Sequence, residues 1–148
     1  MNKEKIRVMI ADAGYEMLGR QLESYSGERF EIVCCTADGS EVYDQTLQTQ
    51  PDVLLMDVFI TNVDGLEVLE QLRDNPSLVD LKIIFLSTVG SSRIINMAFN
   101  LGADYYVMKP CNPKVLAKRI IQIADLAKVG EPMEGCTEED VKLPADNV

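Results

Sequence analysis

Residues 53–73 read VLLMDVFITNVDGLEVLEQLR and contain one predicted strand followed by one predicted helix. Four apolar residues come first and end at Asp57, and Asp64-Gly65 then precedes a segment whose apolar residues recur at helical spacing. A short apolar run predicts a strand covered on both faces, and the amphipathic segment predicts a helix that packs against the sheet.

The same alternation recurs along the whole chain. Further apolar runs occupy residues 6–11, 30–35, 83–86 and 105–108, and amphipathic segments occupy residues 14–25, 40–49, 91–101 and 112–129. Gly102 is typical of a helix end, and Asn112-Pro113 is typical of a helix start. Five strand–helix pairs predict an α/β, doubly wound domain, with a five-stranded parallel sheet and helices on both faces.

The length of 148 residues, with 47% hydrophobic residues, suits one such domain, which we place at residues 1–130. Residues 131–148 read EPMEGCTEEDVKLPADNV, with six acids, one base and no periodicity. This composition predicts an acidic linker or disordered tail.

Charge and composition exclude several functions. The chain has 24 acids, 14 bases and no histidine, for a formal net charge of −10. This balance argues against nucleic-acid binding by the chain itself and against docking on a membrane, and the lack of histidine excludes a Ser-His-Asp triad. The sequence shows no secretory signal, no membrane-length apolar stretch and no C-x-x-C spacing among Cys34, Cys35, Cys111 and Cys136. We therefore expect a cytoplasmic protein with reduced cysteines.

Polar residues follow four of the five predicted strands: Asp12, Asp57, Ser87 and Lys109. Each by itself is typical of a turn, a cap or an ordinary surface position. In an open parallel sheet, however, the carboxyl ends of the strands form the ligand site, so their joint placement indicates function.

These side chains suit phosphoryl transfer to a carboxylate. Asp57 would be the nucleophile, Ser87 would donate a hydrogen bond to a phosphoryl oxygen, and Lys109 would compensate negative charge. A divalent cation such as Mg²⁺ would be held by carboxylate and backbone oxygens.

Other phosphate chemistries have motifs that this chain lacks. There is no G-x-x-x-x-G-K-S/T, which excludes a P-loop, and no G-x-G-x-x-G after the first strand, which argues against a dinucleotide site. Residues 57–61 partly match the D-x-D-x-T motif of aspartate-nucleophile phosphatases. Phe59, however, occupies the place of the second aspartate, which argues against that class.

The chain resembles the receiver domains of bacterial two-component response regulators over about residues 6–129. The resemblance is carried by VLLMDVFITNVDGLEVLEQLR around Asp57, by LGADYYVMKP around Lys109 and by IIFLSTVG, which ends the fourth strand at Ser87. Within the family, the chain looks most like the regulators of the sporulation phosphorelay. The resemblance implies a flavodoxin-like (βα)5 fold of strand order 2-1-3-4-5, and a signalling module rather than an enzyme.

The resemblance also implies a mechanism. A histidine kinase or histidine phosphotransfer protein would supply the phosphoryl group to Asp57. The hydroxyl of Ser87 would then move toward that group, and Tyr106 would rotate inward. The face of the fourth helix, fifth strand and fifth helix would change shape and control an output domain, for example a transcriptional one. The Lys109-Pro110 bond would be cis.

Two positions depart from the family pattern. Ala13 stands where receivers usually have the acid that ligates Mg²⁺ directly. The ligands that the resemblance still implies are Asp12, Asp57 and the backbone carbonyl of Phe59, so we expect weakened Mg²⁺ binding. Thr61 stands where proline is common, and we expect this to loosen the loop.

Two functions therefore stay open. One is a working phosphoacceptor switch, which the presence of Asp57, Ser87 and Lys109 favours. The other is a degenerate receiver, a protein-interaction module independent of phosphorylation, which Ala13 favours.

The surroundings of this domain leave further alternatives. The chain is either a stand-alone receiver or a piece of a longer DNA-binding regulator. The broad apolar faces of residues 91–101 and 112–129 either pack on the sheet or form a homodimer or effector surface.

Overall fold

The computed structural model describes residues 5–26 and 28–129. Its strands are β1 (Ile6–Ala11), β2 (Phe30–Thr36), β3 (Val53–Met56), β4 (Lys82–Ser87) and β5 (Tyr105–Met108). Its helices are α1 (Tyr15–Ser26), α2 (Gly39–Thr49), α3 (Gly65–Arg73), α4 (Ser92–Leu101) and α5 (Pro113–Val129), with a short 3-10 helix, η1 (Pro76–Leu78). Apart from η1, every element had been predicted to within a residue at each end.

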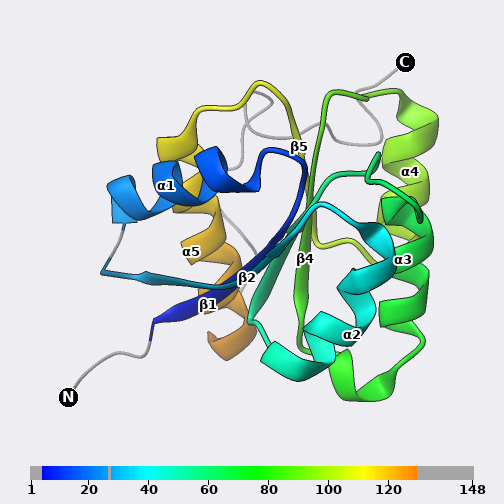
Figure 1. Ribbon diagram of the computed structural model, residues 1–148, viewed down its shortest axis with the longest axis horizontal. Helices are drawn as coiled ribbons and strands as arrows, with labels where there is room; N and C mark the ends of the chain where they lie inside the picture. Colours follow the sequence, from blue (N-terminus) through cyan, green and yellow to red (C-terminus); the bar gives the residue numbers. More distant parts are fainter. Residues whose placement is uncertain (1–4, 27, 130–148) are drawn as a thin grey trace.

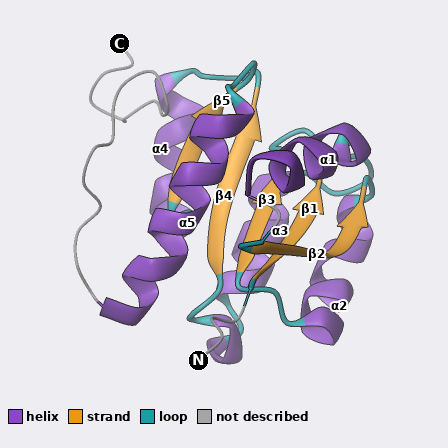
Figure 2. Ribbon diagram, turned by 90° about the vertical axis from the view of Figure 1, so that its left-hand side faces the viewer, coloured by secondary structure: helices purple, strands orange, loops and turns teal. Residues whose placement is uncertain are grey.

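The five strands form one parallel sheet of order β2-β1-β3-β4-β5. Helices α1 and α5 cover one face, and α2, α3 and α4 cover the other (Figures 1 and 2). This arrangement confirms the predicted flavodoxin-like, doubly wound fold. The chain leaves β1 toward β2 on one side and reaches β3 on the other, so a topological switch point lies between β1 and β3.

The central strands carry the core because helices cover them on both sides. All four residues of β3 have no exposed surface, and the same holds for Val8, Met9, Ile10 and Ala11 of β1. The uniformly apolar sequence of β3 follows from this position. Asp57 directly follows β3 and therefore lies at the carboxyl edge of the sheet.

Local signals fix the ends of the helices. Asp64 caps α3, because its carboxylate accepts a hydrogen bond from the backbone N–H of Glu67 at 3.0 Å. Gly102 ends α4 with a positive φ of 113°, a conformation that favours glycine. Asn112 accepts the backbone N–H of Lys114 at 2.9 Å as α5 begins. The Lys109-Pro110 bond is cis, as predicted.

The predicted acidic tail, residues 131–148, lies outside the described residues. Within residues 5–26 and 28–129, no helix combines the length and the apolar character that a membrane span requires.

Candidate functional site

The carboxyl ends of β1, β3 and β5 bring Asp12, Asp57 and Lys109 together. The Nζ atom of Lys109 lies 2.5 Å from Oδ2 of Asp12 and 3.0 Å from Oδ2 of Asp57. We call these three residues the acceptor cluster. It lies at the switch point between β1 and β3, where ligand sites of open α/β sheets occur.

The acceptor cluster is largely shielded from water. The side chains of Asp12, Asp57 and Lys109 are 6%, 18% and 27% exposed. Burial by itself would lower the pKa of Lys109, but its hydrogen bonds to both carboxylates and their negative charge outweigh burial, so the pKa is raised. Lys109 therefore stays charged, and two carboxylates with one ammonium leave the cluster with a net charge of −1.

Backbone amides orient both carboxylates. Oδ1 of Asp12 accepts the N–H of Gly14 at 2.8 Å, and Oδ1 of Asp57 accepts the N–H of Phe59 at 3.0 Å. The backbone of Asp57 also packs closely against Gly65. A Cβ built at Gly65 would lie only 2.5 Å from the Asp57 carbonyl oxygen. Glycine at position 65 therefore lets α3 begin directly against the backbone of Asp57.

Ser87 and Tyr106 form a second group, beside the acceptor cluster. Ser87 is fully buried, and its Oγ accepts the N–H of Val89 at 3.2 Å. The Tyr106 hydroxyl donates to the carbonyl of Val89 at 2.5 Å, and its ring lies 6.0 Å from that of Phe85. Burial raises the pKa of Tyr106, a hydrogen bond with Ser87 opposes this, and the charge of Asp57 adds to it. The Tyr106 side chain is fully buried and points inward.

The oxygen donors suit a hard cation, although the set is small. The carboxylates of Asp12 and Asp57, which both contact Lys109, are the kind of oxygen ligand that Mg²⁺ prefers. Ala13 is exposed and contributes no donor. Within residues 5–26 and 28–129, no three histidine, cysteine or acidic side chains gather in a metal-binding group.

Thr61, in the loop after Asp57, makes contacts with the loop between β2 and α2. The Thr61 hydroxyl donates to the carbonyl of Ala37, and the Thr61 carbonyl accepts the N–H of Gly39 at 2.8 Å. A short parallel bridge joins Asp38 and Thr61. That threonine gives a looser loop than proline stays a prediction. The contact joins two loops far apart in the sequence, and no motif pointed to it.

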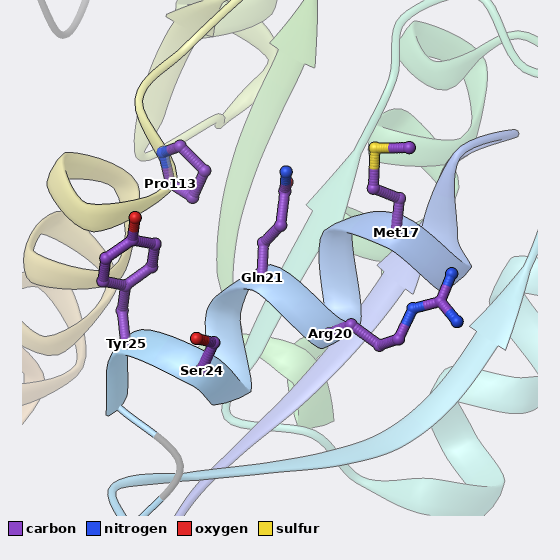
Figure 3. A pocket seen from close by; sticks show the side chains of 6 residues that line it. All are labelled: Met17, Arg20, Gln21, Ser24, Tyr25 and Pro113. Atoms are coloured by element: carbon purple, nitrogen blue, oxygen red, sulfur yellow. The ribbon is translucent and has the colours of Figure 1, made fainter.

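A groove of about 300 Å³ lies between α1 and the first residue of α5 (Figure 3). It is lined by Met17, Arg20, Gln21, Ser24, Tyr25 and Pro113. Figure 3 shows Tyr25 reaching toward Pro113 across the groove. Met17 and Tyr25 are 62% and 53% exposed. One wall, α1, follows the loop that carries Asp12, and Pro113 follows the loop that carries Lys109.

Comparisons with known proteins agree with this architecture. The sequence pattern of the response regulator receiver domain matches residues 4–121. A proposed response regulator from Chloroflexus aurantiacus is 27% identical, with a TM-score of 0.72 over 82% of this chain and 99% of that chain. The signal receiver domain of the proposed response regulator NarL from Mycobacterium tuberculosis is 25% identical, with a TM-score of 0.73 over 83% and 98%.

A third similar structure is a CheY-like receiver domain protein from Methanospirillum hungatei. It is 24% identical, with a TM-score of 0.74 over 86% of this chain and 100% of that chain, and it supports the fold. Receiver domains of this kind are signalling modules rather than enzymes. The match to the receiver pattern spans most of the chain, so this protein belongs to the response regulator receiver domain family of two-component signalling.

Proposed function

We propose that this domain is a phosphoacceptor switch and that Asp57 accepts the phosphoryl group. The observation that carries the proposal is the position of the Asp57 carboxylate. It lies at the end of the buried strand β3, one oxygen held by the Phe59 amide and the other by Lys109. A carboxylate that is oriented, charged and still 18% exposed can serve as a nucleophile.

The step transfers one phosphoryl group. A carboxylate oxygen of Asp57 attacks the phosphorus of a phosphohistidine, and an O–P bond forms as the P–N bond breaks. The electron pair of the broken bond stays on the imidazole nitrogen of the donor. Lys109 offsets negative charge on the acyl phosphate. The Ser87 hydroxyl donates a hydrogen bond to a phosphoryl oxygen.

Mg²⁺, when bound, would neutralise charge on the transferring group, held by Asp12, Asp57 and the Phe59 carbonyl. Both Asp12 oxygens already accept hydrogen bonds, from Gly14 and Lys109. Because Ala13 supplies no carboxylate, we propose that Mg²⁺ binds more weakly here than in a receiver with a second acid.

The phosphoryl donor in this proposal is a histidine kinase or a histidine phosphotransfer protein. The exposed Met17 and Tyr25 of the groove would give it an apolar surface on α1, the helix that follows Asp12. The similarity to sporulation phosphorelay regulators favours a relay in sporulation and a transcriptional output.

The output surface would be the face of α4, β5 and α5, where Met97 is 40% exposed. A second copy or an output domain would cover this face. Residues 131–148 would act as the acidic linker or tail.

A degenerate receiver is the second candidate. Tyr106 is fully buried and its hydroxyl donates to the Val89 carbonyl, which suits a module whose signalling face stays fixed. The position of Lys109 between both carboxylates favours it as well.

Intact-protein mass after incubation with acetyl phosphate and Mg²⁺ separates the two candidates. We expect the wild-type chain to gain one phosphoryl group, Asp57→Asn to gain none, and Ala13→Asp to reach the same gain at lower Mg²⁺. Asp104→Asn, which removes a carboxylate at the far end of the sheet, is the matched control and should behave as wild type. No gain by the wild-type chain at any Mg²⁺ concentration, with a gain by Ala13→Asp, would establish the degenerate receiver.

A further inference from the structure

The loop that follows Asp57 is tied to the loop between β2 and α2. The Thr61 hydroxyl donates to the Ala37 carbonyl, and the Gly39 N–H donates to the Thr61 carbonyl at 2.8 Å. The Asp38 carboxylate, which caps α2 through Ser40, also forms a hydrogen bond with Asn62. We call this set of contacts the loop tie.

The loop tie also requires close packing of the two backbones. A Cβ built at Gly39 would lie 2.0 Å from the carbonyl oxygen of Val63 and 3.0 Å from a methyl carbon of Ile60. Only glycine allows the start of α2 to approach so closely. The loop of residues 58–64 is therefore held on one side by α2 and on the other by Gly65 of α3, which abuts the carbonyl of Asp57.

The held loop orients the acceptor carboxylate. Phe59 lies two residues before Thr61, and its N–H donates to Oδ1 of Asp57 at 3.0 Å. A shift of the peptide before Phe59 would therefore rotate or release the Asp57 carboxylate. Phe59 itself cannot anchor the loop by burial, because it is 64% exposed. On that side Ile60 packs against the core, and the contacts of Thr61 are the first polar restraint after it.

We infer that Thr61 is a positioning residue for phosphoryl transfer at Asp57, acting through the loop tie and the Phe59 amide. This inference rests on the proposed phosphoacceptor function. The hydroxyl of Thr61 does for this loop what a rigid ring would do by restricting the backbone. The hydroxyl restrains the loop through its hydrogen bond to the Ala37 carbonyl. Thr61, unlike proline, also retains a backbone N–H. The contribution is to the orientation of the nucleophile, which affects the rate once the donor is bound.

The test compares Thr61→Val, which removes the hydroxyl at nearly constant shape, with Thr61→Ser, which keeps it. Thr49→Val is the matched control, because the Thr49 hydroxyl also donates to a backbone carbonyl, that of Gln45 at 2.8 Å, at the far end of α2. Phosphoryl uptake from acetyl phosphate is measured over a range of donor concentrations. Urea unfolding establishes that each variant is folded, and hydrogen exchange of the Gly39 amide reports the loop tie directly.

We expect Thr61→Val to lower the maximal rate of uptake by about tenfold, with the half-saturating donor concentration unchanged, since misplacement of the nucleophile affects the bound state. The Gly39 amide should exchange faster in that variant. Thr61→Ser and Thr49→Val should both match the wild type.

Three results would overturn the inference. Equal maximal rates for the wild type and Thr61→Val would do so while leaving the phosphoacceptor function in place. Equally slow Thr61→Val and Thr61→Ser would show that the hydroxyl is not the responsible group. A wild-type chain that takes up no phosphoryl group would overturn the proposed function and this inference together.

Discussion

The two ends of the sheet carry charged clusters of opposite design. At the carboxyl end, one ammonium, that of Lys109, lies between two carboxylates, those of Asp12 and Asp57. At the amino end, one carboxylate, that of Asp104, lies between two cations: Arg73 at 2.9 Å and Lys82 at 4.0 Å. Both clusters join residues from separate elements, and both are partly shielded from solvent.

The clusters differ in what the backbone does around them. The guanidinium of Arg73 also donates to the carbonyls of Gly102 at 3.0 Å and Leu78 at 3.2 Å, and Asp104 accepts the N–H of Ile83 at 2.8 Å. This cluster joins α3, η1, β4 and the loop before β5, and its bonds link protein groups to one another. The acceptor cluster differs in the sign of its charge: two carboxylates and one ammonium give −1, whereas two cations and one carboxylate give +1 at the amino end. We therefore expect the amino end to contribute to stability and, on the proposed function, the carboxyl end to receive the phosphoryl group.

Replacing the lysine at each end should give the largest contrast. Lys109→Gln removes the charge that offsets the acyl phosphate, and we expect it to slow phosphoryl uptake roughly 100-fold, as for loss of one electrostatic group in a phosphoryl-transfer site. Lys82→Gln is the matched control, because the two lysine side chains are 25% and 27% exposed and both contact carboxylates. Uptake curves from intact-protein mass measure both. A comparable slowing by Lys82→Gln would show that the two ends do not differ in this way.

Breaking the amino-end cluster should affect stability without affecting uptake. Arg73→Met removes hydrogen bonds to two carbonyls and to Asp104, and we expect a loss of about 2 kcal/mol in the free energy of unfolding. Arg93→Met, at an exposed position of α4, is the control and should change little. Urea unfolding gives both values.

The same Arg73→Met protein should take up phosphoryl groups at the wild-type rate under conditions where it is folded. A slowed rate in the folded variant would contradict the division of roles between the two ends.

The position of the acceptor cluster could be predicted from sequence, because one topological rule places Asp12, Asp57 and Lys109. Parallel strands end at one edge, so the residues directly after them share that edge, and the long side chain of Lys109 reaches both carboxylates from the end of β5. The amino-end cluster could not be predicted in this way. Arg73, Lys82 and Asp104 carry no spacing signal, and their contact depends on the packing of α3 against the loop before β5.

The loops show the same limit. Thr61 reaches Ala37 across 24 residues of sequence, and the contact exists only because Gly39 lets two backbones approach. Proline and threonine differ in stiffness and in hydrogen bonding, and sequence alone gave weight only to the first. The 3-10 helix η1 is three residues long, too short to produce a periodic pattern.

We expect the smallest effect at Tyr106, which lies in β5 beside the acceptor cluster. Tyr106→Phe removes the hydrogen bond to the Val89 carbonyl, and we expect a loss of about 1 kcal/mol in the free energy of unfolding at neutral pH. Tyr25→Phe removes an exposed hydroxyl and is the matched control, for which we expect no loss at neutral pH.

The pH dependence gives this prediction a second readout. Burial, more than the opposing hydrogen bond with Ser87, raises the pKa of Tyr106, so the native state holds the phenolic proton more tightly than the unfolded chain does. That contribution to stability is complete below the ordinary tyrosine pKa of about 10 and is lost as pH rises through the higher pKa of the folded state. The wild type should therefore lose its advantage over Tyr106→Phe in urea unfolding as pH rises above that value. An advantage that stayed constant or grew with pH would mean that the hydroxyl of Tyr106 is not held neutral in the buried position described here.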